Sequence, residues 1–301
     1  MVPQTVALRS AWPEGVARTV ELTQVPFFPQ DEFQCGPAAL ATVLNYTGVQ
    51  VTPDELAKNV YLPSRQGSLQ VEMLAAPRRH GRISYQLRPQ YEDVLREVAA
   101  GNPVIVLQDV NPVFTQWHYA VLNGFDYPSG TLYLRSGEKR RLEMPFTAFE
   151  REWMAGNRWA MVAVAPDRIP ATAAEDAWMN AVLAMTRVSG AEAAKTAYAT
   201  ALARWPNNLA AAIGLANQYH QAGSYGRAID VLRVAQQRHP ESVIVLNNLA
   251  QALTDEGRHA EALSQIDQAL AIPSPFASDV RATRQLILER IATKQKAGSR
   301  Q

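Results

Sequence analysis

The chain contains one cysteine, Cys35, and the residues around it are those expected around a nucleophile. Cys35-Gly36-Pro37 comes just before an apolar helical stretch, AALATVLNYTG. The aligned N–H dipoles of a helix N-terminus lower the pKa of a thiol, and the thiolate is the nucleophilic form. Gly36 leaves room for a substrate carbonyl to approach the sulfur. The alternative is a small buried hydrophobe, the commoner environment of a lone cysteine without such a context.

A thiolate nucleophile needs a base that a third group holds in place. Five histidines are present. His118 stands out because it begins a predicted strand, Trp117 to Val121, among apolar residues; the alternative is a core histidine satisfied by one hydrogen bond. The others lie at a helix end or in the helical second half of the chain: His80, His220, His239 and His259. We therefore predict that Cys35 and His118 form a nucleophile–base pair.

Two segments together resemble the bacteriocin-processing cysteine peptidases, the double-glycine leader peptidases of papain-like fold. The segments are Gln30…Gln34-Cys35-Gly36-Pro37-Ala38-Ala39-Leu40 and His118-Tyr119-Ala120-Val121…Gly124, and the resemblance covers about residues 20 to 165. It implies that Cys35 is the nucleophile and His118 the general base. It also implies that an upstream glutamine and a backbone N–H near Cys35 form an oxyanion hole. Gln30 matches that glutamine by its place, one residue closer to Cys35 than expected, so Gln34 is the alternative.

The third member of the catalytic triad is the main departure from the family. The family usually has an Asp followed by Pro on the strand after the histidine strand, whereas this chain has Leu134-Arg135-Ser136-Gly137. Asp126 is eight residues beyond His118, roughly 26 Å along one strand at ~3.3 Å per residue. Ser136 returns beside His118 through a hairpin, and its hydroxyl accepts a ring N–H without stabilising an imidazolium as a carboxylate does. We predict Ser136 as the orienting residue, an acid from elsewhere or lost activity being the alternatives.

The elements that position these residues indicate an α+β domain. Predicted helices follow Pro37, begin at a Thr52–Glu55 capping box, and cover about 69–80, 91–101 and 146–156. Predicted strands cover 20–28, 83–87, 103–110, 117–125, 131–136, 140–144 and 158–166, with a hairpin at 127–130. Because helices come mainly first and strands later, we expect a largely antiparallel sheet. The domain is predicted over 20–166, after an N-terminal extension, 1–19.

A 34-residue period organises the rest of the chain. Six paired positions carry it: Pro206 and Pro240, Leu215 and Leu249, Ala216 and Ala250, Gly223 and Gly257, Ala228 and Ala262, and Ala235 and Ala269. Small residues let two helices pack closely, glycine turns between them and proline ends the second. These repeats resemble tetratricopeptide repeats. We predict a linker at 167–172 and an all-α solenoid over 173–301, with a capping helix at about 278–296 and a groove for a protein partner.

Composition excludes several classes of function. The net charge is +1, which gives no overall field for nucleic acid or an anionic membrane. No apolar run approaches the ~20 residues of a membrane span. One cysteine excludes an intrachain disulfide and a thiolate-cluster metal site. Phosphate-binding, zinc-protease and dinucleotide motifs are absent as well, so the prediction includes no cofactor, no metal and no nucleic-acid partner.

The sequence thus predicts a cysteine peptidase that hydrolyses peptide or protein substrates, with the repeats recruiting substrate or partner. The alternative is a catalytically inactive, peptidase-like adaptor; acyl transfer to an amine would use the same residues. Papain-like units fused to such repeats resemble bacterial envelope lipoproteins. We therefore expect a periplasmic location, with membrane attachment only through a lipid anchor outside this sequence, and the cytoplasm as the alternative. Substrate, cleavage sequence and oligomeric state do not follow from the residues.

Overall fold

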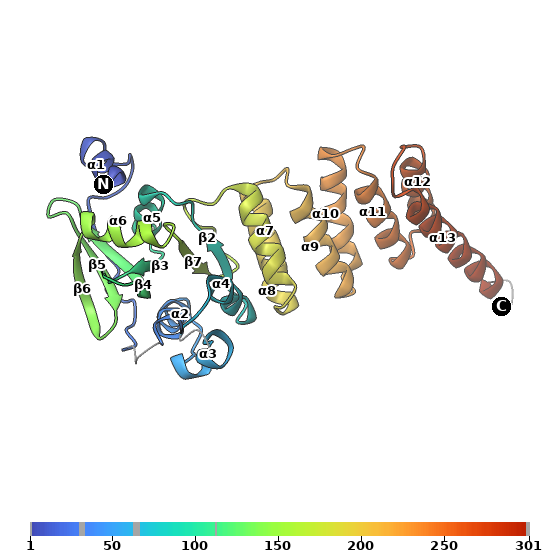
Figure 1. The fold of residues 1–301 in the computed structure, drawn as a ribbon. Helices are drawn as coiled ribbons and strands as arrows, with labels where there is room; N and C mark the ends of the chain where they lie inside the picture. The colour runs from blue at the N-terminus through green and yellow to red at the C-terminus, as the bar shows by residue number, and fades with distance from the viewer. Residues whose placement is uncertain (1, 30–33, 63–66, 112, 299–301) are drawn as a thin grey trace. The chain divides into compact units, whose positions relative to one another are not determined.

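The computed structural model describes residues 2–29, 34–62, 67–111 and 113–298. The chain divides into two compact units, residues 1–193 and 194–301 (Figure 1). The first combines a sheet with helices, and the second is helical. Each unit is described by itself below.

The first unit is built on an antiparallel sheet, which confirms the predicted sheet type. In the described part of the chain it has seven strands: β1 (Thr19–Glu21), β2 (Ile83–Gln86), β3 (Val104–Asp109), β4 (Trp117–Asp126), β5 (Thr131–Ser136), β6 (Lys139–Pro145) and β7 (Ala160–Val164). The order is β2-β7-β3-β4-β5-β6, with β1 paired to β4. The strand expected over 20–28 is thus only a short one. The β4–β5 hairpin forms, and it brings Arg135 opposite Val121.

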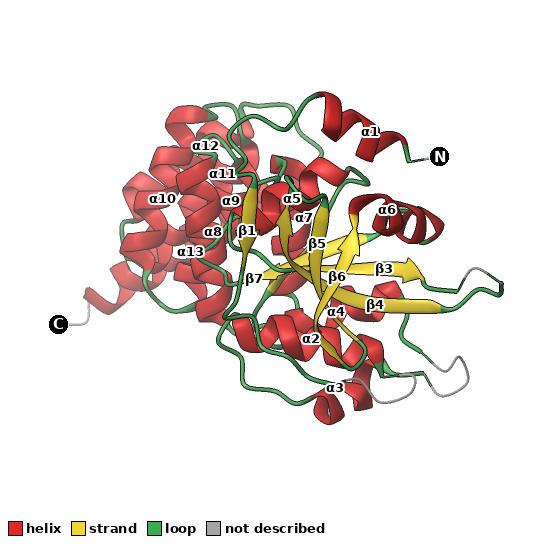
Figure 2. Ribbon diagram, turned by 90° about the vertical axis from the view of Figure 1, so that its left-hand side faces the viewer, coloured by secondary structure: helices red, strands yellow, loops and turns green. Residues whose placement is uncertain are grey.

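Helices cover both faces of the sheet. They are α1 (Pro3–Ser10), α2 (Cys35–Tyr46), α3 (Pro53–Val60), α4 (Gln70–Arg79), α5 (Tyr91–Ala99), α6 (Phe146–Ala155) and α7 (Glu175–Thr186). Helices α2, α3 and α4 lie on one side of the sheet and α1, α5 and α6 on the other (Figure 2). The predicted capping box is present at Thr52 and Glu55, and α4 contains Pro77 in its last turn.

The core beneath α2 explains why the chain positions Cys35 as it does. Every residue of α2 from Gly36 to Leu44 is buried, and Leu40 and Leu44 are fully so. Across from them lie Ile105, Val121 and Met161 from three neighbouring strands. Because the apolar face of α2 is held along its length, its first residue is fixed beside β4, the strand that carries His118.

The N-terminal segment, to which sequence analysis assigned no element, contains the docked helix α1. The carboxylate of Glu150, on α6 and fully buried, accepts the backbone N–H groups of Gln4 and Thr5 at 2.9 and 2.6 Å. It also accepts the hydroxyl of Thr5 at 2.6 Å. A carboxylate at this place satisfies two of the amides that a helix start leaves unpaired and faces the positive end of its dipole.

The segment after β7 is held by a second buried carboxylate. Glu97 on α5 accepts the backbone N–H and the hydroxyl of Thr172 at 2.7 and 2.6 Å, and the side-chain amide of Asn102 at 2.6 Å. Next along the chain, α7 packs Trp178 against Tyr85 of β2. Residues 167–186 therefore pack against the sheet domain within the first unit; the predicted domain bounds stay a prediction.

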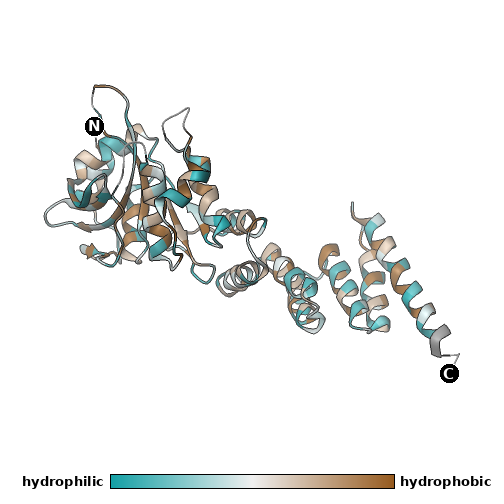
Figure 3. Cartoon of the chain, turned by 90° about the horizontal axis from the view of Figure 1, so that it is seen from below, coloured by the Kyte–Doolittle hydropathy of each residue, from teal (hydrophilic) through white to brown (hydrophobic). Residues whose placement is uncertain are grey.

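The second unit is a run of paired helices, as the 34-residue period predicts. They are α8 (Ala191–Arg204), which begins just before the division between units, α9 (Leu209–Gln221), α10 (Tyr225–Arg238), α11 (Val243–Asp255), α12 (His259–Leu270) and α13 (Ala277–Gly298). The paired residues Ala228 and Ala262 are both fully buried. Gly223 and Gly257 turn between helices with φ of 70° and 83°. Hydrophobic residues alternate with hydrophilic ones along these helices (Figure 3).

Among the helices that the structure describes, none combines the length and the apolar character needed to cross a membrane.

Candidate functional site

Cys35 is the first residue of α2, with its sulfur half-buried against the core. Three backbone N–H groups hydrogen-bond to the thiol and lower its pKa: those of Tyr119, Gly36 and Cys35 itself. Burial acts more strongly in the opposite direction, so the pKa of Cys35 is raised overall. The bond from Tyr119 joins the start of α2 to β4 at the residue that follows His118.

His118, the second residue of β4, is held by Ser136. Its Nε2 lies 2.8 Å from the Ser136 hydroxyl oxygen. The hairpin register favours this contact. Arg135 pairs with Val121 in an antiparallel ladder, so Ser136, the next residue of β5, lies one position closer to the His118 end of β4. When Nε2–H donates to Ser136, the other ring nitrogen, Nδ1, is left unprotonated and able to accept a proton.

The resting electrostatics of the site favour neutral groups. Burial lowers the pKa of His118 to about 4, so its imidazole is uncharged at neutral pH. Burial likewise keeps Cys35 in the thiol form at that pH. Burial thus favours the uncharged form of both Cys35 and His118. Each group needs a stabilising partner before it can become charged.

The remaining predicted residues fall in different places. Gln30 lies outside the described residues. Gln34 is the N-cap residue of α2, and its side chain makes no capping hydrogen bond. Asp126 is at the far end of β4, where its carboxylate accepts the Thr19 hydroxyl at 2.6 Å and the Ser129 backbone N–H at 3.3 Å. Asp126 and His118 therefore lie at opposite ends of β4, as strand geometry predicts, and Asp126 does not contact His118.

Three residues near the site were missed by sequence reasoning. Tyr119 contributes its backbone N–H to Cys35, and its hydroxyl donates to the Ser68 carbonyl at 3.2 Å. Ser68 lies so close to Gly36 that a Cβ there would be 2.4 Å from its oxygen. Gln108 is directly opposite His118 on β3 and donates to Glu152 at 2.8 Å. The sequence contains one indication of the Ser68 contact. A glycine directly after Cys35 indicates that another part of the chain comes close to the backbone there, but it does not show which part.

Comparison with known families matches both halves of the chain. Residues 22–161 match the model of the Peptidase_C39 like family. Residues 187–242 and 235–278 match the tetratricopeptide repeat. The chain carries a C39-like domain followed by tetratricopeptide repeats. The predicted family resemblance and fold class are thereby confirmed. No curated protein matches the chain.

Several solved structures are similar to parts of the chain. One is described as a C39-like peptidase from Bacillus anthracis, with 21% identity and a TM-score of 0.43 over 49% of this chain and 98% of that chain. Another is MamA MSR-1 C2, with 21% identity and a TM-score of 0.35 over 42% and 71%. A third, MamA from Desulfovibrio magneticus RS-1, has 14% identity and a TM-score of 0.31 over 42% and 77%.

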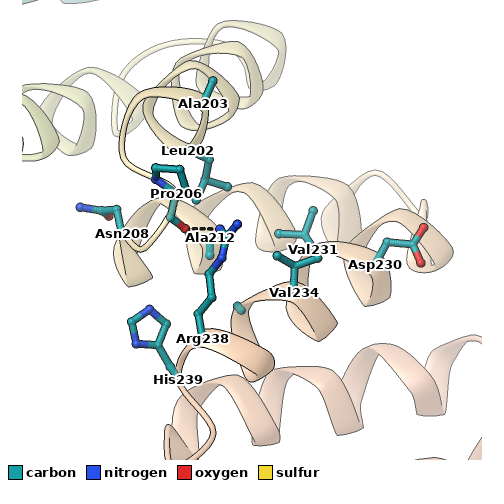
Figure 4. Close-up of a pocket in the computed structure, with 11 residues that line it drawn as sticks. Leu202, Ala203, Pro206, Asn208, Ala212, Asp230, Val231, Val234, Arg238 and His239 are labelled. Atoms are coloured by element: carbon teal, nitrogen blue, oxygen red, sulfur yellow. Dashed lines mark hydrogen bonds between the residues drawn. The ribbon is translucent and has the colours of Figure 1, made fainter.

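The repeats have a hollow of their own. It has a volume of about 390 Å³ and is lined by apolar residues of α8 and α10, including Leu202, Val231 and Val234. In Figure 4 the guanidinium group of Arg238 points to the carbonyl of Pro206, to which it donates a hydrogen bond, and the ring of His239 lies at the same end. Asp230 lies at the opposite end (Figure 4).

The chemistry open to the C39-like domain follows from its donor set. Within the part of the chain that the structure describes, no three His, Cys, Asp or Glu side chains are grouped so as to hold a metal ion. What the site does offer is a thiol with backbone N–H groups around it and a neutral imidazole oriented by a hydroxyl. These are the parts of a nucleophilic, acyl-transferring site.

Proposed function

We propose that the chain is a cysteine peptidase that hydrolyses peptide or protein substrates at Cys35, and that its tetratricopeptide repeats recruit the substrate or a protein partner. The observation that carries the proposal is the pair of bonds that meet at β4. The Tyr119 backbone N–H reaches the Cys35 sulfur, and the ring of His118, the residue before Tyr119, is bonded to Ser136.

The proposed reaction runs through an acyl-enzyme. As the sulfur of Cys35 adds to the substrate carbonyl carbon, its proton passes to Nδ1 of His118. The backbone N–H of Cys35 and a glutamine side chain, Gln30 or Gln34, stabilise the oxyanion that forms. His118 then gives the proton to the leaving amine as the C–N bond breaks. Water, deprotonated by His118, attacks the thioester, releasing the carboxylic acid and restoring the thiol.

Alkylation of Cys35 by a peptidyl chloromethyl ketone tests this proposal. We expect His118→Ala to slow the labelling of Cys35 at pH 7 by at least tenfold, since general-base catalysis typically contributes about 10²–10⁴-fold. The matched control is His80→Ala, at the end of α4, which should label at the parent rate. Equal rates for the parent and His118→Ala would contradict the proposal. Separate Gln30→Ala and Gln34→Ala variants then identify the glutamine whose loss reduces peptide turnover.

Two observations favour a second candidate, an inactive peptidase-like adaptor. His118 meets a hydroxyl where the resemblance implies a carboxylate, and burial raises the pKa of the Cys35 thiol. Both features reduce the stability of the charged pair on which catalysis depends. Binding of a peptide by the parent without release of cleaved product over long incubation would favour the adaptor.

The cellular location stays part of the proposal. We place the protein in the bacterial cell envelope, with the cytoplasm as the alternative, by resemblance to envelope lipoproteins that combine papain-like units with these repeats. Fractionation of cells that express the full-length gene would check it.

A further inference from the structure

A pocket opens on the C39-like domain beside the proposed site. Its volume is about 290 Å³. The walls come from the start of α4, the paired ends of β3 and β4, and the end of α6: Ser68, Leu69, Leu107, Trp117, Tyr119 and Ala155 among others. None of the described residues that line it is charged. For comparison, an engineered apolar cavity of about 150 Å³ holds benzene, so this pocket has room for one large apolar side chain.

Two contacts place the pocket one residue away from the nucleophile. Tyr119 lines it, and the backbone N–H of the same residue bonds the sulfur of Cys35. Ser68 also lines it and lies against Gly36, the residue after Cys35. Through Tyr119 and Ser68, the lining of the pocket therefore adjoins the residues that contact Cys35 and Gly36.

The walls combine hydrophobic side chains with uncharged polar ones. Trp117 is 52% exposed and Leu69 is 38% exposed, so two large hydrophobic side chains of the lining face solvent. At the opposite wall, Gly156 lies so near the Leu107 carbonyl that a Cβ would be 2.5 Å from its oxygen. The next residue, Asn157, has a left-handed φ of 53°. That close approach holds the end of α6 against β3 and sets the width of the pocket.

We propose that this pocket takes a leucine, methionine or phenylalanine side chain adjacent to the scissile bond, so that the preferred substrates carry a large apolar residue there and not a pair of glycines. The inference rests on the proposed function, whose substrate class it specifies. Glycine in that position would leave Trp117 and Leu69 in water, whereas a leucine covers them. Burial of a side chain of this size is worth about 1.5–3 kcal/mol, which corresponds to a preference of about tenfold or more.

Four electrophiles measure the preference on the full chain. Acetyl-Gly-Leu and acetyl-Gly-Gly chloromethyl ketones place the variable side chain on the residue that carries the reacting carbonyl, on one side of the reacting carbon. Iodoacetyl-leucine amide and iodoacetyl-glycine amide place it on the other. Labelling at pH 8.5, with iodoacetamide as the reference for thiol accessibility, makes the leucine-to-glycine rate ratio measurable whether or not His118 acts as a base.

Two variants alter the pocket and one serves as the control. Ala155→Trp fills it from the exposed end of α6. Leu69→Asp puts a charge in its wall at the N-cap of α4, where aspartate is favourable for the helix. Ala271→Trp makes the same substitution as Ala155→Trp at the C-cap of α12.

In the parent and in Ala271→Trp, we expect the leucine probe of one of the two pairs to label Cys35 at least ten times faster than its glycine counterpart. Ala155→Trp and Leu69→Asp should lower that ratio to two or less. A parent ratio near one with both pairs, or a ratio that neither pocket variant changes, overturns the inference, as does labelling by iodoacetamide alone. A ratio of ten, combined with equal labelling rates of the parent and His118→Ala at pH 7, would keep the pocket and reject the hydrolase. His118-dependent labelling with a ratio of one would do the reverse.

Discussion

The hydrogen bond between His118 and Ser136 determines what the Cys35 sulfur can do before substrate binds. A carboxylate in that place would stabilise a charged imidazole and, through it, a thiolate. A hydroxyl orients the ring without supplying a negative charge, and burial then lowers the pKa of His118 to about 4. In the proposed peptidase, Cys35 would therefore be a nucleophile that is not ionised before substrate binds.

The pH dependence of alkylation tests this resting state. Iodoacetamide needs the thiolate, and burial raises the pKa of Cys35. We therefore expect the alkylation rate to rise by about tenfold per pH unit from pH 6 to pH 8, because the thiolate fraction does so below the pKa of a thiol. A preformed thiolate–imidazolium pair would instead give a rate that is nearly constant from about pH 5 upwards, and that profile would show the description to be wrong.

Substituting Ser136 should change the balance between the charged and neutral forms of His118. Ser136→Asp places a carboxylate against Nε2 and should raise the pKa of His118, since a nearby negative charge favours the charged imidazole. We expect faster alkylation of Cys35 below pH 7 in this variant.

Ser136→Ala removes one neutral hydrogen bond, worth about 1 kcal/mol, and should slow peptide turnover about threefold to tenfold. The matched control is Asp126→Ala at the far end of β4, for which kinetics like those of the parent are expected.

At the scale of elements, buried carboxylates attach the segments that flank the sheet domain. Glu150 accepts three hydrogen bonds from α1, all from Gln4 and Thr5. Glu150→Ala leaves buried donors without an acceptor, and each such group costs about 1–3 kcal/mol. We expect the free energy of unfolding of the first unit, measured in urea, to fall by about 3 kcal/mol. Amide exchange at residues 4–10 should become faster than in the parent.

Glu14→Ala is the control for Glu150→Ala, because this glutamate is exposed and its side chain accepts no corresponding set of bonds in the described structure. It should change the free energy of unfolding by no more than about 0.5 kcal/mol. If Glu150→Ala were equally mild, α1 would be held mainly by apolar contacts such as that of buried Leu8.

The elements that sequence predicts well are those with local signals. The capping box at Thr52, the glycine turns and the 34-residue period each depend on residues close together or evenly spaced, and all appear in the structure. Helix α1 was missed because its acceptor, Glu150, is 145 positions away from Thr5. The pocket near the candidate site was missed for the same reason, since its walls come from four separate segments. Periodicity reports which face of an element is buried, but not what lies against it.

At the scale of the whole molecule, the candidate site belongs to the first compact unit, and helices α9 to α13 of the repeats belong to the second. Gly257 turns between α11 and α12 with φ of 83° in open space, so a side chain there meets no atom and costs backbone strain alone. We expect Gly257→Ala to destabilise the second unit by about 1 kcal/mol in thermal unfolding, with the labelling rate of Cys35 unchanged. Gly226→Ala, inside α10, should leave the repeats equally stable or slightly more so. A changed labelling rate in Gly257→Ala would mean that the repeats act on the site directly.

The protonated resting thiol has a consequence for survival in an oxidising compartment. Peroxide attacks thiolates, and the first product, a sulfenic acid, can be oxidised further to a sulfonic acid, which is irreversible. Because burial raises the pKa of Cys35, very little of it is in the vulnerable form at neutral pH. The same burial should therefore let the single cysteine of this chain resist oxidation for longer where peroxide is abundant.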